Sequence, residues 1–97
     1  MTGKQKKYLR ALAHSLKPLV NLGKHGLTPE IKFEIESQLL DHELIKCKVL
    51  ESCPLSKKKC VEEISAMVGV EVVQVIGKTI VLFCPHPEDP KIKLSVK

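Results

Sequence analysis

Residues 19–30, LVNLGKHGLTPE, mark the point where the chain passes from a strand into a helix. The apolar and β-favouring residues 19–22 predict a short strand. Thr28 can cap a helix with its hydroxyl group, and Pro29 suits the first helical position because the amide hydrogen that it lacks would have no partner there. Glu30 complements the positive end of the helix dipole. The stretch therefore predicts a strand, a loop bracketed by glycines, and a sharply defined helix start.

The loop itself, Gly23-Lys24-His25-Gly26, has the features of an anion-binding corner. Glycine at both ends lets the backbone approach a ligand closely. The first backbone N–H groups of the following helix have no intrahelical acceptor, so we expect them to point outward with a partial positive charge. Nucleic acid is the favoured anion for a small basic protein. The structural alternative is a tight turn in which glycine only supplies a positive φ.

Basic charge is concentrated in the first quarter of the chain. The net charge is +5, and residues 1–27 hold six basic side chains and no acidic one, whereas the remaining seventy residues hold ten basic and eleven acidic groups. Such an asymmetry favours a polyanionic partner, and a solvated helix face that merely aids solubility is the alternative. The candidate contacts in this segment, outside the loop, are Lys7, Arg10, His14 and Lys17.

Apolar spacing predicts two helices on either side of this loop. The first covers about residues 4–16, and the second covers residues 29–42 with a mostly acidic exposed side. The predicted buried positions of the first helix are Tyr8, Leu9, Leu12, Ala13 and Leu16. Those of the second helix are Ile31, Ile35, Leu39 and Leu40.

The second half of the chain predicts a strand, a helix and a hairpin. Residues 44–50 alternate between apolar and basic side chains, the pattern of a half-buried strand. Ser56 caps a third helix that Gly69 ends. The buried positions predicted for this helix are Cys60, Val61, Ile64, Met67 and Val68. Residues 70–76 and 79–84 form two strands, and the glycine of the intervening pair 77–78 predicts a type II′ turn.

The predicted order α-β-α-β-α-β-β indicates an α/β fold, a mixed sheet packed by helices. Ninety-seven residues suffice for one domain over residues 1–97, with its core at about residues 3–85 and a proline-rich tail over 86–97. Within the tail, residues 91–94 either add an edge strand or stay loose. The sequence leaves open which face of the sheet the first helix covers.

Several functional classes receive no support from the sequence. No run of about eighteen apolar residues spans a membrane, and the N-terminus lacks a secretory signal, so we expect a cytoplasmic protein. The four cysteines lack paired spacing, which predicts free thiols and no metal site. No catalytic motif is present. The sequence therefore predicts a binding protein, not an enzyme, with no cofactor and no small-molecule substrate. We expect a monomer, although the sequence leaves the oligomeric state open.

The mode of nucleic-acid contact also follows from composition. Tyr8, Phe33 and Phe83 are the only aromatic residues, too few for a sheet that stacks bases, so contact should be to phosphates and sugars. Three lysines at 57–59 oppose the dipole of the third helix unless a phosphate lies nearby. Lys57 and Lys78 are therefore secondary candidates, and a solvated patch is an equally good explanation of these charges.

Six segments of the chain together resemble the CRM domain, in particular the small YhbY-like proteins of bacteria. The resemblance covers roughly residues 3–85. The matching segments are KQK at 4–6, LAH at 12–14, LKP at 16–18, GKHGLT at 23–28, HELIK at 42–46 and VQVIGKT at 73–79. One departure is Cys84 before Pro85, where many relatives carry an arginine, which leaves a basic contact there in doubt.

The resemblance implies a fold similar to KH-like modules and to the C-terminal domain of translation initiation factor three. It also implies RNA binding without catalysis, on ribosomal RNA in precursors of the large ribosomal subunit, with residues 23–26 as the family's GxxG loop. The full set of predicted RNA contacts is Lys7, Arg10, His14, Lys17, Gly23, Lys24, His25, Gly26, Thr28, Lys57 and Lys78. The alternative is a protein-interaction module that docks the basic helix on an acidic protein surface.

Overall fold

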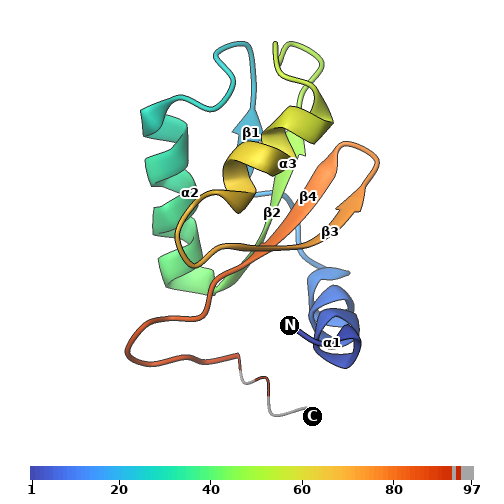
Figure 1. Ribbon diagram of the computed structural model, residues 1–97, viewed down its shortest axis with the longest axis vertical. Helices are drawn as coiled ribbons and strands as arrows, with labels where there is room; N and C mark the ends of the chain where they lie inside the picture. Colours follow the sequence, from blue (N-terminus) through green and yellow to red (C-terminus); the bar gives the residue numbers. More distant parts are fainter. Residues whose placement is uncertain (93, 95–97) are drawn as a thin grey trace.

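The computed structural model describes residues 1–92 and 94, and it has helices on both faces of one sheet (Figure 1). The elements in chain order are α1 (Gly3–Ala13), β1 (Val20–Leu22), α2 (Pro29–His42), β2 (Leu44–Val49), α3 (Lys57–Ser65), β3 (Glu71–Ile76) and β4 (Thr79–Phe83). The predicted element order and the α/β class are confirmed.

The sheet is mixed, as predicted, with the strand order β1-β2-β4-β3. β1 runs parallel to β2, with Val20 opposite Cys47, and β4 is antiparallel to both of its neighbours. Gly77 links β3 and β4 with a φ of 56°, as a type II′ turn requires at that position. Of the strands in the described residues, the last, β4, therefore lies inside the sheet, and the shortest, β1, lies at one edge.

Two apolar clusters, one on each face of the sheet, hold the layers together. α2 and α3 cover one face, where Ile35, Cys60 and Ile64 pack on the strands. α1 covers the opposite face through Leu9 and Ala13. This arrangement settles which face α1 covers. Because both faces are covered, β2 buries Leu44 as well as the alternating apolar positions, so it is more deeply buried than the half-buried strand predicted.

Some predicted core positions are exposed. α1 ends at Ala13, short of the predicted residue 16, and its side chains Tyr8, Leu12 and Leu16 are 41%, 39% and 38% exposed. A helix that lies flat on a sheet buries only a narrow stripe, so these three predictions were wrong. Val68 is 95% exposed because α3 ends at Ser65, which leaves Val68 in the turn that follows. Leu40 is exposed as well.

The segment after β4 is anchored by one carboxylate. Glu43, which follows α2 with a φ of 66°, is only 2% exposed. Its Oε2 accepts the His86 N–H at 2.7 Å, and its Oε1 accepts the N–H groups of Lys91 and Ile92 at 2.8 Å each. Burial opposes ionisation, but these three backbone donors outweigh it and lower the pKa of Glu43.

The anchored segment packs on the α1 face of the sheet. Ile92 and Leu94 lie against the cluster around Leu9 and Phe83. Of the predicted edge-strand residues, 91, 92 and 94 are not in a strand, and Lys93 lies outside the described residues.

Candidate functional site

The glycine loop forms a tight turn whose two central side chains are exposed. The Gly26 N–H donates to the Gly23 carbonyl at 2.9 Å, and Gly26 has a φ of 67°. Lys24 and His25 project from this turn into solvent. Within the described residues, the backbone N–H groups of Lys24 and His25 have no protein acceptor. The positive φ that this turn requires is sufficient reason for a glycine at position 26. The turn also leaves two amides and two basic side chains available to a ligand.

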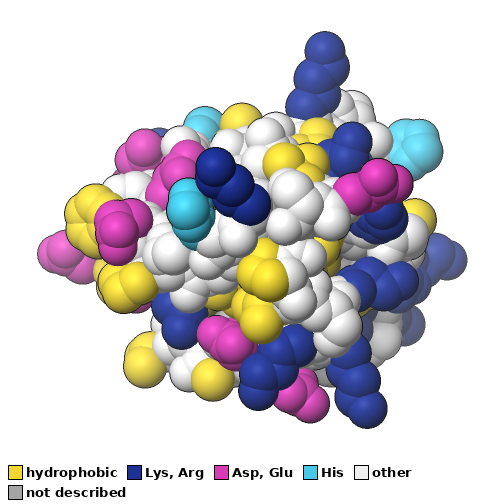
Figure 2. All heavy atoms as spheres, turned by 90° about the horizontal axis from the view of Figure 1, so that it is seen from above, with side chains coloured by type: hydrophobic (Ala, Val, Ile, Leu, Met, Phe, Trp, Pro, Cys, Tyr) yellow, Lys and Arg dark blue, Asp and Glu magenta, His cyan; other side chains and the backbone are white. Residues whose placement is uncertain are grey.

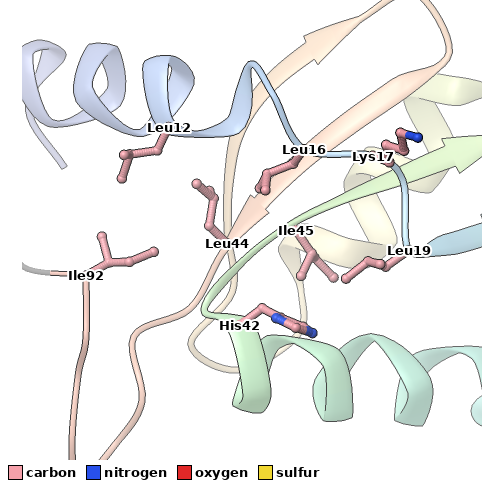
Figure 3. A pocket seen from close by; sticks show the side chains of 8 residues that line it. All are labelled: Leu12, Leu16, Lys17, Leu19, His42, Leu44, Ile45 and Ile92. Carbon is pink, nitrogen blue, oxygen red and sulfur yellow. The ribbon is translucent and has the colours of Figure 1, made fainter.

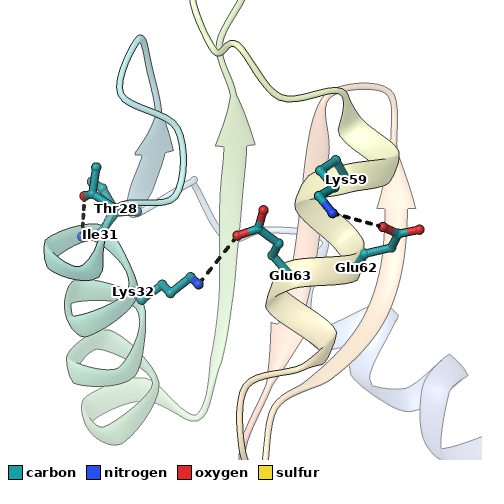
Figure 4. Close-up of polar contacts among 6 residues, drawn as sticks. All are labelled: Thr28, Ile31, Lys32, Lys59, Glu62 and Glu63. Atoms are coloured by element: carbon teal, nitrogen blue, oxygen red, sulfur yellow. Dashed lines mark hydrogen bonds and ion pairs between the residues drawn. The ribbon is translucent and has the colours of Figure 1, made fainter.

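The start of α2 contributes fewer free amides than the sequence indicated. Thr28 Oγ1 accepts the Ile31 N–H at 3.2 Å (Figure 4), and the Thr28 carbonyl accepts the Lys32 N–H at 3.0 Å. Pro29 has no N–H group. Among the described residues of this first turn, only the Glu30 N–H remains without an acceptor. The Thr28 cap is confirmed, but the positive charge of this corner comes mainly from side chains.

A hollow of about 560 Å³ lies between the loop and the helix start. Its lining residues are Gly23, Lys24, His25, Gly26, Thr28, Glu30 and Ile31. The carboxylate of Glu30 also belongs to this hollow, so an anion would bind toward the Lys24 side, where the charge is positive.

Two further segments meet the glycine loop at the same end of the molecule. Atoms of Leu50 and Ser52 lie 3.8 Å from the position of a Cβ on Gly23, and Leu55 lies 3.5 Å from that on Gly26. The turn after β3 joins them, because the Val49 N–H donates to the Lys78 carbonyl at 2.7 Å. We call this region, formed by residues 23–28, 50–58 and 77–78, the loop end.

The lysines of the loop end differ in how far they are neutralised. Lys78 Nζ lies 3.4 Å from Glu51 Oε1, and Lys59, at the edge of this region, pairs with Glu62 at 3.8 Å (Figure 4). Lys57 and Lys58 have no carboxylate partner within the described residues. Figure 2, which views the molecule from this end, shows Lys and Arg mainly on the right and Asp and Glu densest at the left edge, the side of α2.

The structure divides the predicted contacts into two groups. Seven of them lie at the loop end: Gly23, Lys24, His25, Gly26, Thr28, Lys57 and Lys78. The other four, which we call the α1 group, are Lys7, Arg10, His14 and Lys17. All four α1-group side chains are exposed, but α1 lies toward the opposite end of the long axis from the glycine loop (Figure 1). The two groups therefore do not form a single cluster.

Of the four free thiols, those of Cys47 and Cys60 are buried, and those of Cys53 and Cys84 are partly buried. Burial raises the pKa of Cys47 to about 12, and burial together with the neighbouring Cys53 thiol raises that of Cys60 to about 11. The Cys53 and Cys60 sulfurs are 4.0 Å apart. No cluster of three or more metal-ligating side chains occurs among the described residues. None of the described helices combines the length and the apolar character that crossing a membrane requires.

The element order and the mixed sheet agree with the expected CRM-type domain, and the family comparison shows that class. The model of the CRS1 / YhbY (CRM) domain matches residues 1–83, so the chain belongs to this family. The chain is 38% identical over 94 residues to the Bacillus subtilis protein named "Probable RNA-binding protein YqeI", with 97% of this chain and 98% of that protein covered.

Two further relatives cover nearly the whole chain. It is 41% identical over 97 residues to a Haemophilus influenzae protein named "RNA-binding protein", with 100% and 97% covered. The solution structure of a Staphylococcus aureus protein superposes with a TM-score of 0.77 at 40% identity, covering 96% of this chain and 97% of that one.

Proposed function

We propose that this chain binds RNA and has no enzymatic activity of its own. Membership of the CRM family supports an RNA partner, as do the relatives from Bacillus subtilis and Haemophilus influenzae, which are named as RNA-binding proteins. The RNA we propose is ribosomal RNA in precursors of the large subunit. This finer assignment is supported by the resemblance to YhbY-like proteins.

The observation that carries the proposal is the chemistry of the loop end. It combines backbone amides at Lys24 and His25 with the ammonium groups of Lys57 and Lys58, none of which has a partner among residues 1–92 and 94. Amides and ammonium groups both donate hydrogen bonds to phosphate oxygens. Such contacts position a sugar-phosphate backbone without reading its sequence. We therefore expect binding that is strongly dependent on salt and weakly dependent on sequence.

The α1 group supplies a second contact on the same polymer. The molecule is 39 Å long in its longest direction, and the loop end and α1 lie toward opposite ends of that axis (Figure 1). A polyanion can follow the molecule over this length, whereas a small anion occupies only one site. RNA is thus the partner that uses both basic regions at once.

The direct test compares two charge variants of the glycine loop. Replacing Lys24 and His25 by aspartate is expected to weaken binding to ribosomal RNA fragments and to flatten the salt dependence. Replacing Lys24 by arginine and His25 by asparagine keeps the formal charge of the loop and serves as the matched control. Binding is measured by fluorescence anisotropy at several salt concentrations, with circular dichroism as a check of the fold. Equal affinities of the aspartate variant and the unmodified chain would refute this assignment of the site.

The alternative is a protein-interaction module that docks α1 on an acidic protein surface. Because the α1 group lies apart from the loop end, we retain protein interaction as the second candidate function. Sedimentation with precursors of the large ribosomal subunit, before and after ribonuclease treatment, separates the two functions. Association that survives removal of the RNA would support the protein-interaction function.

A further inference from the structure

A second hollow, of about 440 Å³, lies at the outer edge of β2, between α1 and the end of α2 (Figure 3). Its lining side chains are Leu12, Leu16, Lys17, Leu19, His42, Leu44, Ile45 and Ile92. Six of these are aliphatic, so the walls are apolar although the hollow is open to solvent. The volume is in the range of about 300–1,000 Å³ that is usual for small-ligand sites.

Two of the walls of this pocket are the outer edge of β2 and the segment that follows β4. β1 begins opposite Cys47, so the outer edge of β2 at Leu44 has no neighbouring strand among the described residues. The Glu43 carboxylate holds the Ile92 N–H and thereby fixes the wall opposite α1. Because the walls belong to fixed segments, the pocket is preformed. Leu12 and Leu16 are exposed because they line it.

The rim of the pocket carries positive charge and a planar ring. Figure 3 shows the His42 imidazole beside Leu19 and Ile45, and the Lys17 ammonium group directed away from the apolar centre. The segment that forms the α1 wall belongs to residues 1–27, which contain no acidic side chain. An occupant that fits these surroundings has a flat apolar face for the pocket and an attached anion for Lys17.

We propose that this pocket holds one unstacked nucleobase of the bound RNA. Leu12, Leu16 and Ile92 contact the faces of the base, and the His42 ring packs beside it. Lys17 contacts the phosphate of the same nucleotide. Bases that are turned out of a stack do pack on histidine and other planar side chains. An apolar peptide would fill the same walls but would gain nothing from the cation at the rim.

This inference rests on the proposed RNA-binding function and changes how the RNA is contacted. The scarcity of aromatic residues indicated contact with phosphates and sugars only. The pocket adds one base contact that uses aliphatic walls. The N–H and carbonyl groups of Leu44, which lie at the free outer edge of β2, are available to the edge of the base.

The experiment compares two single-stranded probes of equal length and charge, an oligouridylate and an abasic ribose-phosphate oligomer. The unmodified chain is expected to bind the oligouridylate about tenfold more tightly, the effect of one stacked base. In the double variant Leu12→Gln, Leu16→Gln this advantage disappears, while affinity for the abasic oligomer stays the same. Leu40→Gln, an exposed leucine on α2 outside this pocket, is the matched control and keeps the advantage.

The outcomes separate this inference from the proposed function. Equal binding of both probes by the unmodified chain would overturn the base pocket and leave RNA binding intact. Binding of neither probe would overturn both. A uridine advantage that survives in the double leucine variant would also refute the pocket. The pocket would likewise be refuted if the double leucine variant no longer associated with ribosomal particles but kept its preference for the oligouridylate. The occupant of the pocket would then be a protein.

A second variant keeps the test decisive if the double leucine variant does not fold. His42 is exposed, so His42→Ala should leave the fold intact. This variant is expected to lose severalfold of the uridine advantage, and an unchanged advantage would contradict the pocket. Circular dichroism and a thermal melt of each variant establish which of the two is used.

Discussion

Replacing Glu43 should detach the segment that follows β4 and destabilise the whole domain. The carboxylate accepts three backbone N–H groups at 2.7–2.8 Å. A hydrogen bond to a charged group contributes about 1.5–3 kcal/mol. The released amides can bond to water, so the three contributions do not add fully. We expect Glu43→Ala to lower the free energy of unfolding by about 3 kcal/mol.

The backbone at Glu43 allows a second comparison. Its φ of 66° lies in the region that favours glycine. Glu43→Gly removes the same carboxylate but relieves this strain, so it should be more stable than Glu43→Ala by about 1 kcal/mol. Glu88→Ala removes an exposed carboxylate from the same segment and is the control, with no expected change.

The effect of Glu43 should also depend on pH with a definite sign. The pKa of Glu43 is lower in the folded protein than in the unfolded chain, because the backbone donors stabilise the ionised form. The contribution of Glu43 to the free energy of unfolding is therefore complete above the ordinary pKa of glutamate, about 4.3. It is lost as the pH falls through the lowered pKa of Glu43 in the folded protein. The difference between the native chain and Glu43→Ala should shrink in acid.

Urea denaturation at neutral and acidic pH measures these differences. Amide hydrogen exchange at Lys91 and Ile92 reports the detachment itself and should speed up in Glu43→Ala. An alanine variant with unchanged urea midpoint and unchanged exchange at these two amides would refute the anchoring role.

Three further predictions concern the loop end and the thiols. Gly26→Ala should cost about 1 kcal/mol in thermal unfolding because its φ is 67°, whereas Gly23→Ala, at a position without a positive φ and with only ordinary van der Waals neighbours, should be nearly neutral. Lys57→Gln should reduce the slope of log affinity against log salt for single-stranded RNA by about 0.7, and an unchanged slope would exclude a phosphate contact there. Cys47 and Cys60, with pKa values of about 12 and 11, should alkylate slowly at pH 8 and faster as the pH rises, as mass spectrometry can follow.

The features that sequence predicted well are those that depend on neighbouring residues. The start of α2 was correct because Thr28 and Pro29 define it locally. The hairpin was correct because Gly77 supplies the conformation that its turn needs. In both cases the cause lies within a few residues of the element, so no knowledge of the rest of the fold was required.

The features that sequence missed depend on contacts between distant segments. Glu43 and Lys91 are far apart in the chain, and no local pattern marks the carboxylate as a buried anchor. Leu12 and Leu16 have the spacing of core residues, yet the end of α1 at Ala13 and the path of the chain after it leave them on the wall of a pocket. The distance between α1 and the glycine loop likewise depends on which face of the sheet α1 covers.

The central position of β4 has a consequence for how this domain is made. Because β4, the last strand among the described residues, joins β2 to β3, residues 79–83 must leave the ribosome before the two halves of the sheet can associate. In a nascent chain that stops before this strand, the edge of β2 that normally pairs with β4 stays unpaired. An unpaired strand edge promotes aggregation. Folding of this domain is therefore completed only after β4 has been made, and a nonsense mutation just before residue 79 should be as harmful as one early in the chain.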